Sequence, residues 1–307
     1  MLATISAIIP LFALIGAGFA LRRLDIFGVA SQIELARFVT RLALPVLMFR
    51  IVAEARPADI WQPGFILVYA GGIFFAMALA IMLRRPKVGM ADAIVDGLTA
   101  SFSNTAFLGI PLCLALFGPP GLLGPSIGTI MTVCLLFALS ILLIEIALQP
   151  GAAPLILAGR ALGAALKNPL VFAPAFGALL SIGGLALPVS VVRFVDLLGA
   201  AASPCALVAL GMFVAERRPA VSSSGVALLA ALKLVVQPAA TFVLAYLIWP
   251  QPPFWAKMAV LVAALPTGTG PFMLAELYGR EADVAARTIL VTTSLSIVTL
   301  AALMVWL

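Results

Sequence analysis

The segment SFSNTAFLGIPLCLALFG, residues Ser101–Gly118, decides the fold of this chain. It is apolar enough for a membrane-spanning helix, yet Asn104, Gly109 and Pro111 lie near its middle. Proline removes a helical N–H and clashes with the carbonyl four residues earlier, and glycine lets the backbone leave helical dihedral angles. The segment therefore predicts a helix that is interrupted half-way across a membrane.

The composition indicates that lipid is the solvent for most of the chain. Hydrophobic residues make up 64% of the 307 residues and charged residues only 10%, and the mean hydropathy is +1.22. Soluble domains carry about 25% charged residues. At about 20 residues for each crossing, the length predicts about ten transmembrane helices. We place them near residues 2–21, 36–53, 63–83, 91–117, 124–148, 168–187, 189–215, 224–249, 254–279 and 283–306.

The distribution of charge predicts the orientation of these spans. The net charge is +6, but basic residues recur in short connections and cover no single face, so we expect no nucleic-acid partner. The connections after odd-numbered spans carry Arg22, Arg23, Arg84, Arg85, Lys87, Arg160, Lys167, Arg217, Arg218, Arg280 and Arg287. Those after even-numbered spans carry only Arg56, beside two acidic residues, and Lys257. Since basic connections stay in the cytoplasm, we predict a multi-pass cell-membrane protein with both termini non-cytoplasmic.

A weak internal repeat relates the two halves of the chain. The segment RFVTRLALPVLMF on span 2 matches RFVDLLGAAASPCALVALGMF on span 7, which puts Pro45 159 residues before Pro204. Asn104 on span 4 lies 162 residues before Pro266 on span 9. Five spans is an odd number, so two such repeats, 1–150 and 151–307, would have opposite orientations. Inverted repeats of this kind are typical of secondary transporters.

Span 9 carries a second interruption at the matching depth, LPTGTGPF at Leu265–Phe272. Unpaired backbone groups are costly in hydrocarbon, so both interruptions must face protein or a water-filled cavity. A single interruption is as readily explained by a packing kink, because proline and glycine are common in membrane helices. Two interruptions at related positions, both with polar companions, favour a binding site.

The two interruptions also predict what the site binds. Each starts a new half-helix, near Phe107 and near Phe272, whose N-terminus carries the positive end of the helix dipole. Because the spans run in opposite directions, both positive ends point at one place. The amide of Asn104 and the hydroxyls of Thr267 and Thr269 add hydrogen-bonding groups, and neither span has Lys or Arg at this depth. The arrangement predicts a site that binds a carboxylate and releases it.

Both interrupted segments, SFSNTAFLGIPLCLALFG and AALPTGTGPFMLAELYG, resemble signature segments of the auxin efflux carrier family. That family includes the plant PIN proteins and bacterial carriers often called malonate or organic-acid permeases. The segments LKNPLVFAPAFGALL, ASPCALVALGMFV, LKLVVQP and ILVTTSLSIVTL resemble it in the expected order, so the resemblance covers essentially the whole chain. It implies an all-α membrane fold of ten helices in two inverted repeats, related to bile-acid symporters and sodium/proton antiporters, in which broken spans 4 and 9 cross.

The resemblance further implies how such a carrier works. Spans 3–5 and 8–10 would form a mobile transport domain against a scaffold of spans 1, 2, 6 and 7, in elevator-type transport of small organic anions. By analogy with the fold we expect a homodimer through the scaffold, and we expect no cofactor or metal. The substrate-binding positions would be Asn104, Thr105, Leu108, Pro111, Pro266, Thr267, Gly268, Thr269, Gly270, Pro271, Pro45, Met48 and Thr132. Lys233, Gln237 and Asp96 would serve coupling or support.

Three departures from the plant members bear on the substrate. Met48 stands where plant members can carry serine, and Thr132 stands where a plant-type glutamine would be. Both argue against auxin itself. The connection at about residues 149–167 is short, so the long hydrophilic regulatory loop of plant members is absent.

Ionisable residues inside the membrane are functional candidates. Lys233, one turn before Gln237, either supplies a fixed positive charge in place of a coupling cation, exchanges a proton, or pairs with a structural carboxylate. Asp96 is either a coupling group or part of a solvated helix end. Glu145 and Glu276 lie near cytoplasmic ends, where anchoring or pairing is expected. Arg193 and Asp196 are three residues apart and are expected to pair with each other.

An enzyme and a channel are the alternatives to a carrier. The sequence contains no histidine, which excludes an HExxH metal site and a Ser–His pair, and no aspartate pair lies at mid-depth. We therefore expect no enzyme. An anion channel is the alternative from a different class, and a sodium- or proton-coupled carboxylate symporter is the alternative among carriers. The tandem aspartates of electrogenic sodium/proton antiporters are missing from the crossing.

Overall fold

The computed structural model describes residues 2–54, 61–148, 159, 163, 169–185, 187–216 and 223–306. Within them the chain is helical, apart from short connections and one isolated backbone bridge. Of the predicted basic connections, Arg56, Arg160, Lys167, Arg217 and Arg218 lie outside the described residues. The predicted all-α architecture is confirmed.

Among the described residues, five helices are long and apolar enough to cross a membrane. They are Pro63–Val88, Pro119–Leu148, Val189–Val214, Ser224–Ile248 and Ala282–Val305. Three shorter apolar helices cover Thr105–Phe117, Phe172–Ile182 and Pro253–Ala264. Two of these short helices, Thr105–Phe117 and Pro253–Ala264, belong to the spans whose interruption the sequence predicts. The helices have the length and composition of a multi-pass membrane protein.

The chain forms two compact units, each made of segments from several parts of the sequence. The first comprises residues 1–62, 106–130 and 166–217, and the second comprises 63–105, 131–165 and 218–307. The first contains α1 (Leu2–Arg23), α2 (Val29–Phe38), η1 (Val39–Ala43), α3 (Leu44–Glu54), α7 (Ile110–Phe117), η3 (Pro119–Leu122), α8 (Leu123–Ile130), α11 (Pro169–Ile182), α12 (Val189–Ala200) and α13 (Ala202–Val214). The second contains α5 (Pro63–Val88), α6 (Met90–Ser101), η4 (Met131–Leu136), α9 (Phe137–Leu148), α14 (Ser223–Ala231), η5 (Leu232–Val236), α15 (Gln237–Phe242), η6 (Val243–Ile248), α16 (Pro253–Ala264), α17 (Gly270–Leu277) and α18 (Ala282–Trp306). The segment η2 (Thr105–Gly109) runs from the second unit into the first.

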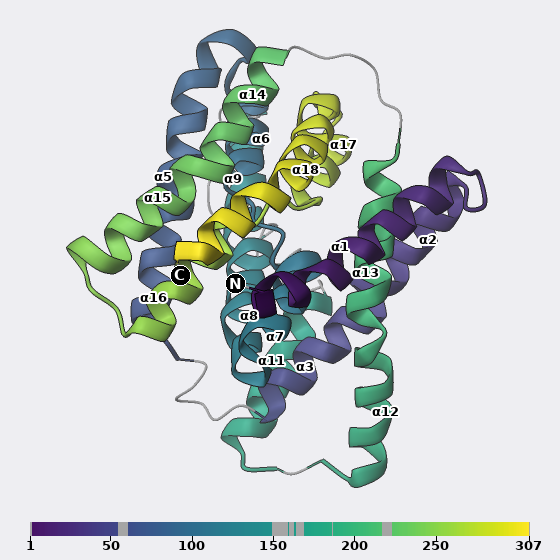
Figure 1. Cartoon of the computed structure of the whole chain (residues 1–307). Coiled ribbons are helices and arrows are strands. Elements are labelled where there is room, and N and C mark those ends of the chain that lie inside the picture. Colours follow the sequence, from purple (N-terminus) through teal and green to yellow (C-terminus); the bar gives the residue numbers. More distant parts are fainter. Residues whose placement is uncertain are drawn as a thin grey trace. The chain divides into compact units, whose positions relative to one another are not determined.

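In the first unit, small residues let helix backbones approach closely. Helix α1 packs along α13, and α3 packs along α11 (Figure 1). A Cβ atom at Gly18 would lie 2.1 Å from the Val208 carbonyl oxygen, and one at Gly211 would lie 2.0 Å from that of Ile15. Helix pairs in membranes associate through such close packing, because the lipid supplies no hydrophobic driving force between them.

The second unit is built around α5, which packs against α6, α15 and α16. Gly72 on α5 makes room for α15, since a Cβ atom there would lie 2.0 Å from the Thr241 hydroxyl oxygen. Near the start of α14, a buried apolar cluster joins α5, α6, α14, η5 and α18 through Ala80, Ala100, Val226, Leu229, Leu232 and Val284. This packing holds the interrupted helices described below.

Wide π-helical turns recur in these helices, and proline explains most of them. Of the five π segments in the described part of the chain, η1, η2, η5 and η6 each end two residues before a proline, namely Pro45, Pro111, Pro238 and Pro250. A proline ring clashes with the carbonyl of the preceding turn, and a π turn displaces that carbonyl. The helices thus accommodate Pro45, Pro111 and Pro238 without an open break, whereas η6 ends its helix at Ile248, before Pro250.

One expectation about the charged residues needs correction. Asp196 does not pair with Arg193: it accepts a hydrogen bond from the Arg50 guanidinium on α3, 2.8 Å from its Nε. Arg50 also forms an ion pair with Glu54, one turn later on α3. Helix packing brings α3 beside α12, so the interhelical partner replaces the neighbour in sequence.

Candidate functional site

The first predicted interruption lies at Phe102–Asn104, slightly before the residues that signalled it. Helix α6 ends at Ser101, Phe102 adopts extended backbone angles (φ −80°, ψ 96°), and the chain becomes helical again at Thr105. Gly109 and Pro111 are themselves helical, because the π turn η2 accommodates the proline and Pro111 stands in the first turn of α7. A proline in the first turn removes no intrahelical hydrogen bond. The interruption was predicted correctly, but its position was displaced.

The second interruption separates α16 from α17. Helix α16 ends at Ala264, Leu265 is extended (φ −58°, ψ 148°), and α17 begins at Gly270. Pro266, Thr267, Gly268 and Thr269 form the non-helical stretch. Pro271 is the second residue of α17, where a missing N–H costs nothing.

The two non-helical stretches pair with each other in antiparallel orientation at Ser103 and Thr267. Backbone hydrogen bonds flank this pair on both sides, from the N–H of Asn104 to the carbonyl of Pro266 (2.8 Å) and from the N–H of Gly268 to the carbonyl of Phe102 (2.9 Å). Each broken helix thus supplies partners for backbone groups that the other exposes, as burial in a membrane requires.

Side chains complete the pairing. The Thr267 hydroxyl donates to the carbonyl of Thr99 in the last turn of α6, at 3.0 Å. The Thr267 N–H donates to the hydroxyl of Thr292 on α18, at 3.1 Å. All three threonines are fully buried. The pairing is therefore a buried, hydrogen-bonded junction.

Glycine is required where the two stretches meet. Cβ atoms at Gly268 and Gly270 would lie 3.0 Å and 2.7 Å from the ring carbons of Phe102. The Phe102 ring thus lies close to a backbone that has no side chain at these positions. Gly268 and Gly270, predicted as substrate-site residues, form part of the crossing itself.

Two helical segments begin beside the junction, one at Thr105 and the other at Gly270. Asn104 directly precedes the first and is 5% exposed, and Thr269 directly precedes the second and is partly exposed. The first turn of each segment has backbone N–H groups without intrahelical partners and a positive dipole end. Amide, hydroxyl and backbone donors of this kind suit an anion better than a cation.

The remaining predicted substrate-site residues are distributed over both units. Asn104, Thr105 and all residues of the second interruption belong to the second unit, as does Thr132, which lies buried in η4. Pro45 and Met48 lie in α3, Leu108 in η2 and Pro111 in α7, and all four are buried in the first unit. That these four line the same cavity as Asn104 stays a prediction.

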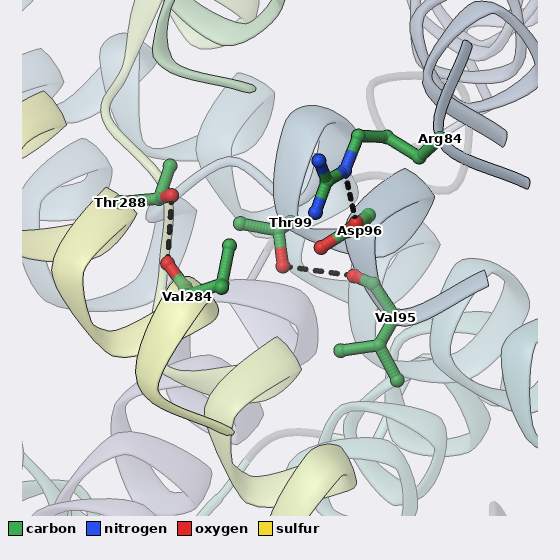
Figure 2. A network of polar contacts seen from close by, with 6 residues as sticks. All are labelled: Arg84, Val95, Asp96, Thr99, Val284 and Thr288. Atoms are coloured by element: carbon green, nitrogen blue, oxygen red, sulfur yellow. Dashed lines mark hydrogen bonds and ion pairs between the residues drawn. The ribbon is translucent and has the colours of Figure 1, made fainter. Parts of the chain in front are cut away.

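A buried ion pair joins the last turns of α5 to the middle of α6 (Figure 2). Arg84, near the end of α5, donates from Nε to a carboxylate oxygen of Asp96 at 2.6 Å, and both side chains are about nine-tenths buried. Asp96 is therefore not part of a solvated helix end. Figure 2 also draws Thr99 and Thr288, whose hydroxyls each donate to the carbonyl one turn back. The sequence spacing could have predicted that Arg84 pairs with Asp96. The two residues lie on either side of the turn at Gly89, so they face each other across the consecutive helices α5 and α6.

Further polar contacts tie the same end of the second unit together. The Arg280 guanidinium donates from Nε to Asp92 on α6 at 2.8 Å, and this hydrogen bond raises the pKa of Arg280. The Tyr278 hydroxyl donates to Glu145 on α9 at 2.8 Å, so Glu145 is paired as predicted. These contacts join α6, α9 and the segment after α17.

The two predicted support residues on the eighth span both reach the broken helices. Lys233 donates to the backbone carbonyl of Ala263, and Gln237 donates to that of Ser101. Both side chains are fully buried. In the described part of the chain Lys233 takes part in no ion pair, so the pairing with a structural carboxylate is not seen.

Residues at the crossing that the sequence did not single out include Tyr69, Thr99, Phe102, Ser103 and Thr292. Tyr69 on α5 is fully buried and its hydroxyl lies beside the Ser103 hydroxyl. Phe102 and Ser103 lie within the segment Ser101–Gly118, but a phenylalanine and a serine are common in membrane helices. Their residue types therefore did not indicate a role at the crossing. Thr99 lies in the last turn of the broken helix α6, whereas Tyr69 and Thr292 reach the crossing only through helix packing.

Comparison with known proteins agrees with this architecture. The sequence pattern of a family described as "Membrane transport protein" matches residues 3–304. A protein of Rhizobium meliloti (strain 1021) named "Putative malonate transporter" is 28% identical, over 97% of this chain and 93% of its own length. The "Auxin efflux carrier component 8" of Arabidopsis thaliana is 23% identical over 91% of this chain and 90% of its own length. An "Uncharacterized transporter" of Methanothermobacter thermautotrophicus is 24% identical, with 95% of each chain covered.

These matches confirm the resemblance to the auxin efflux carrier family that the interrupted segments suggested. The family consists of membrane transporters and not of enzymes. Its pattern extends over both interrupted spans and nearly the full length of the sequence. This multi-pass membrane protein therefore belongs to the membrane transport protein family, the group of the auxin efflux carriers.

Proposed function

We propose that this transporter carries small organic anions, carboxylates such as malonate or auxin-like acids, by elevator-type alternating access. The observation that carries the proposal is the crossing of the two broken helices. Two helical segments begin beside one buried backbone pair, and Asn104 and Thr269 directly precede them. Neither interruption contains a basic residue, so anion binding would depend on dipoles and hydrogen bonds that permit release.

The relatives support the substrate class. Two of them are named for a malonate transporter and an auxin efflux carrier, and both names refer to carboxylates. Met48 and Thr132 replace the serine and glutamine that the family resemblance led us to expect in plant-type members. We therefore favour a short mono- or dicarboxylate over auxin itself.

The composition of the two units supports the elevator mechanism. The second unit gathers α5, α6, η4 with α9, and all described helices after residue 222, which correspond to parts of the predicted transport spans 3–5 and 8–10. The first unit gathers α1–α3 and α11–α13, the predicted scaffold spans 1, 2, 6 and 7, together with α7 and α8. Within the proposal, ten spans form two inverted repeats, and the crossing moves with the transport spans.

The test is counterflow in proteoliposomes with a panel of radiolabelled mono- and dicarboxylates. Vesicles that contain a carrier and are preloaded with an unlabelled substrate accumulate the labelled substrate transiently, and the rate of uptake saturates with substrate concentration. An anion channel dissipates its gradient without such stimulation by the opposite side. Imposed sodium and proton gradients in the same vesicles separate the coupled symporter from uncoupled exchange. Absence of counterflow with every acid would refute the proposed substrate class.

We also propose a homodimer through the scaffold spans, by analogy with the fold. Native mass spectrometry of the protein in detergent should show two chains for each particle. A monomer that retains full transport activity would contradict the dimer and leave the proposed substrate class unaffected.

A further inference from the structure

Two side chains of the eighth span reach the backbone of both broken helices. Lys233 in η5 and Gln237, the first residue of α15, are four residues apart and both fully buried. The Lys233 Nζ donates to the Ala263 carbonyl at 2.7 Å. The Gln237 Nε2 donates to the Ser101 carbonyl at 3.2 Å. Both acceptors are backbone carbonyl oxygens, so the residue type does not distinguish them. Their common feature is their position within the broken helices.

Both carbonyls lie at the C-terminal end of a first half-helix. Ser101 is the last residue of α6, and Ala263 is the last but one of α16. The last four carbonyls of a helix have no intrahelical partner, and at mid-membrane water is not freely available to replace one. The interruptions thus create two sets of acceptors, and one short stretch of the eighth span donates to a member of each set.

We infer that Lys233 and Gln237 are positioning residues that cap the two first half-helices and thereby fix the crossing from which the second halves begin. The inference deepens the proposed function and rests on it for its effect on transport. The Lys233 Nζ donates at the negative end of the α16 dipole, where a hydrogen-bond donor interacts favourably. From Ala263 the chain needs only three further residues to reach Pro266, whose carbonyl bonds to Asn104.

The local structure of the eighth span explains how two donors reach targets in different helices. The π turn η5 precedes Pro238 and widens the helix at Lys233. The glycine at position 72 lets α5 lie directly against α15, since a Cβ atom there would lie 3.3 Å from the Gln237 carbonyl oxygen. The donor-bearing turn is therefore braced by α5 while its side chains extend to α6 and α16.

The test uses n-propylammonium, which has the composition of the side chain that Lys233→Ala removes beyond Cβ. In purified Lys233→Ala the Ala263 carbonyl loses its donor, so we expect the Tm to fall by about 3–10 °C. Propylammonium chloride should restore most of that loss, and choline chloride at the same concentration should restore none. Lys257→Ala, which removes another lysine from α16, is the matched control and should respond equally to both salts.

Gln237→Leu provides a second variant that does not depend on the lysine. It removes the donor to Ser101 at similar volume, and its Tm should also fall, without rescue by propylammonium. A wild-type Tm in both Lys233→Ala and Gln237→Leu would overturn the inference. So would a Tm of Lys233→Ala that the two salts raise equally.

A transport measurement separates this inference from the proposed function. Where the wild-type protein shows malonate counterflow, the affinity of Lys233→Ala for malonate should fall about tenfold or more and recover with propylammonium in parallel with the Tm. If propylammonium restores the Tm of Lys233→Ala but the wild-type protein transports no carboxylate, the capping role is supported and the proposed substrate class is refuted. If Lys233→Ala has the Tm of the wild type and transports malonate normally, the capping role is refuted and the proposed substrate class is supported.

Discussion

At the scale of single residues, Asn104 combines a backbone role with a side-chain role. Its N–H is committed to the Pro266 carbonyl, so substitution of the side chain leaves that contact intact. The side chain is 5% exposed and directly precedes the helical segment that begins at Thr105. A ligand-binding role and a capping role for this amide make opposite predictions for two substitutions.

We expect Asn104→Leu to weaken carboxylate binding by about ten- to a hundredfold, since one hydrogen bond to a charged group contributes about 1.5–3 kcal/mol. Asn104→Asp should be worse, because it places a negative charge where an anion binds in a low-dielectric site. Equilibrium binding of the acid that gives counterflow, measured on both purified variants, distinguishes the ligand-binding role from the capping role. If the amide only caps a helix, Asp should replace it well, and an Asp variant that binds normally would exclude the anion site.

The Arg84–Asp96 pair makes a prediction about stability. Removing one partner of a buried ion pair leaves an uncompensated charge and costs about 3–5 kcal/mol. Arg84→Met and Asp96→Leu should therefore each lower the Tm strongly, whereas the double variant that combines them should lose much less. Thermal unfolding of the two single variants and the double variant measures the coupling. Strictly additive losses would show that the two side chains do not interact.

At the scale of elements, the crossing depends on how closely two interrupted helices approach. A Cβ atom at Gly270 would lie 2.7 Å from the Phe102 ring, closer than any normal contact. Gly270→Ala should therefore push α17 away from the end of α6. We expect a lower Tm and reduced counterflow, with partial recovery when Phe102→Leu is added to make room.

The matched control for this variant is Gly16→Ala on α1, where a new Cβ atom meets nothing within 4 Å. Alanine is also the better helix former by about 1 kcal/mol, so this variant should be as stable as the wild type or slightly more stable. Equal effects of Gly16→Ala and Gly270→Ala would show that the tight crossing contributes nothing specific.

At the scale of the whole molecule, the pattern of basic connections predicts the orientation in the membrane. A reporter that is active only in the cytoplasm should be silent when fused after Leu307, because both termini are predicted to be non-cytoplasmic. The same reporter fused after Phe27, following Arg22 and Arg23, should be active. A bright C-terminal fusion would reverse the assignment of every loop.

The sequence by itself determined the class of protein, the helical architecture and both interruptions. Composition requires a membrane, and proline with glycine at mid-span requires a broken helix, because these effects act through the residue itself and its near neighbours along the chain. The second interruption was placed correctly. The first was displaced, because a π turn could accommodate Pro111 and left the break to the preceding residues.

Only the tertiary structure decided the partners. Asp96 pairs with Arg84 and Asp196 with Arg50, and Lys233 donates to a backbone carbonyl on another helix. Such partners are chosen by which helices pack together, and packing in a membrane depends on close backbone approach at glycines such as Gly72. A backbone carbonyl looks the same at every residue of a sequence. It becomes a specific target only when a broken helix leaves it without a partner and another helix places a donor beside it.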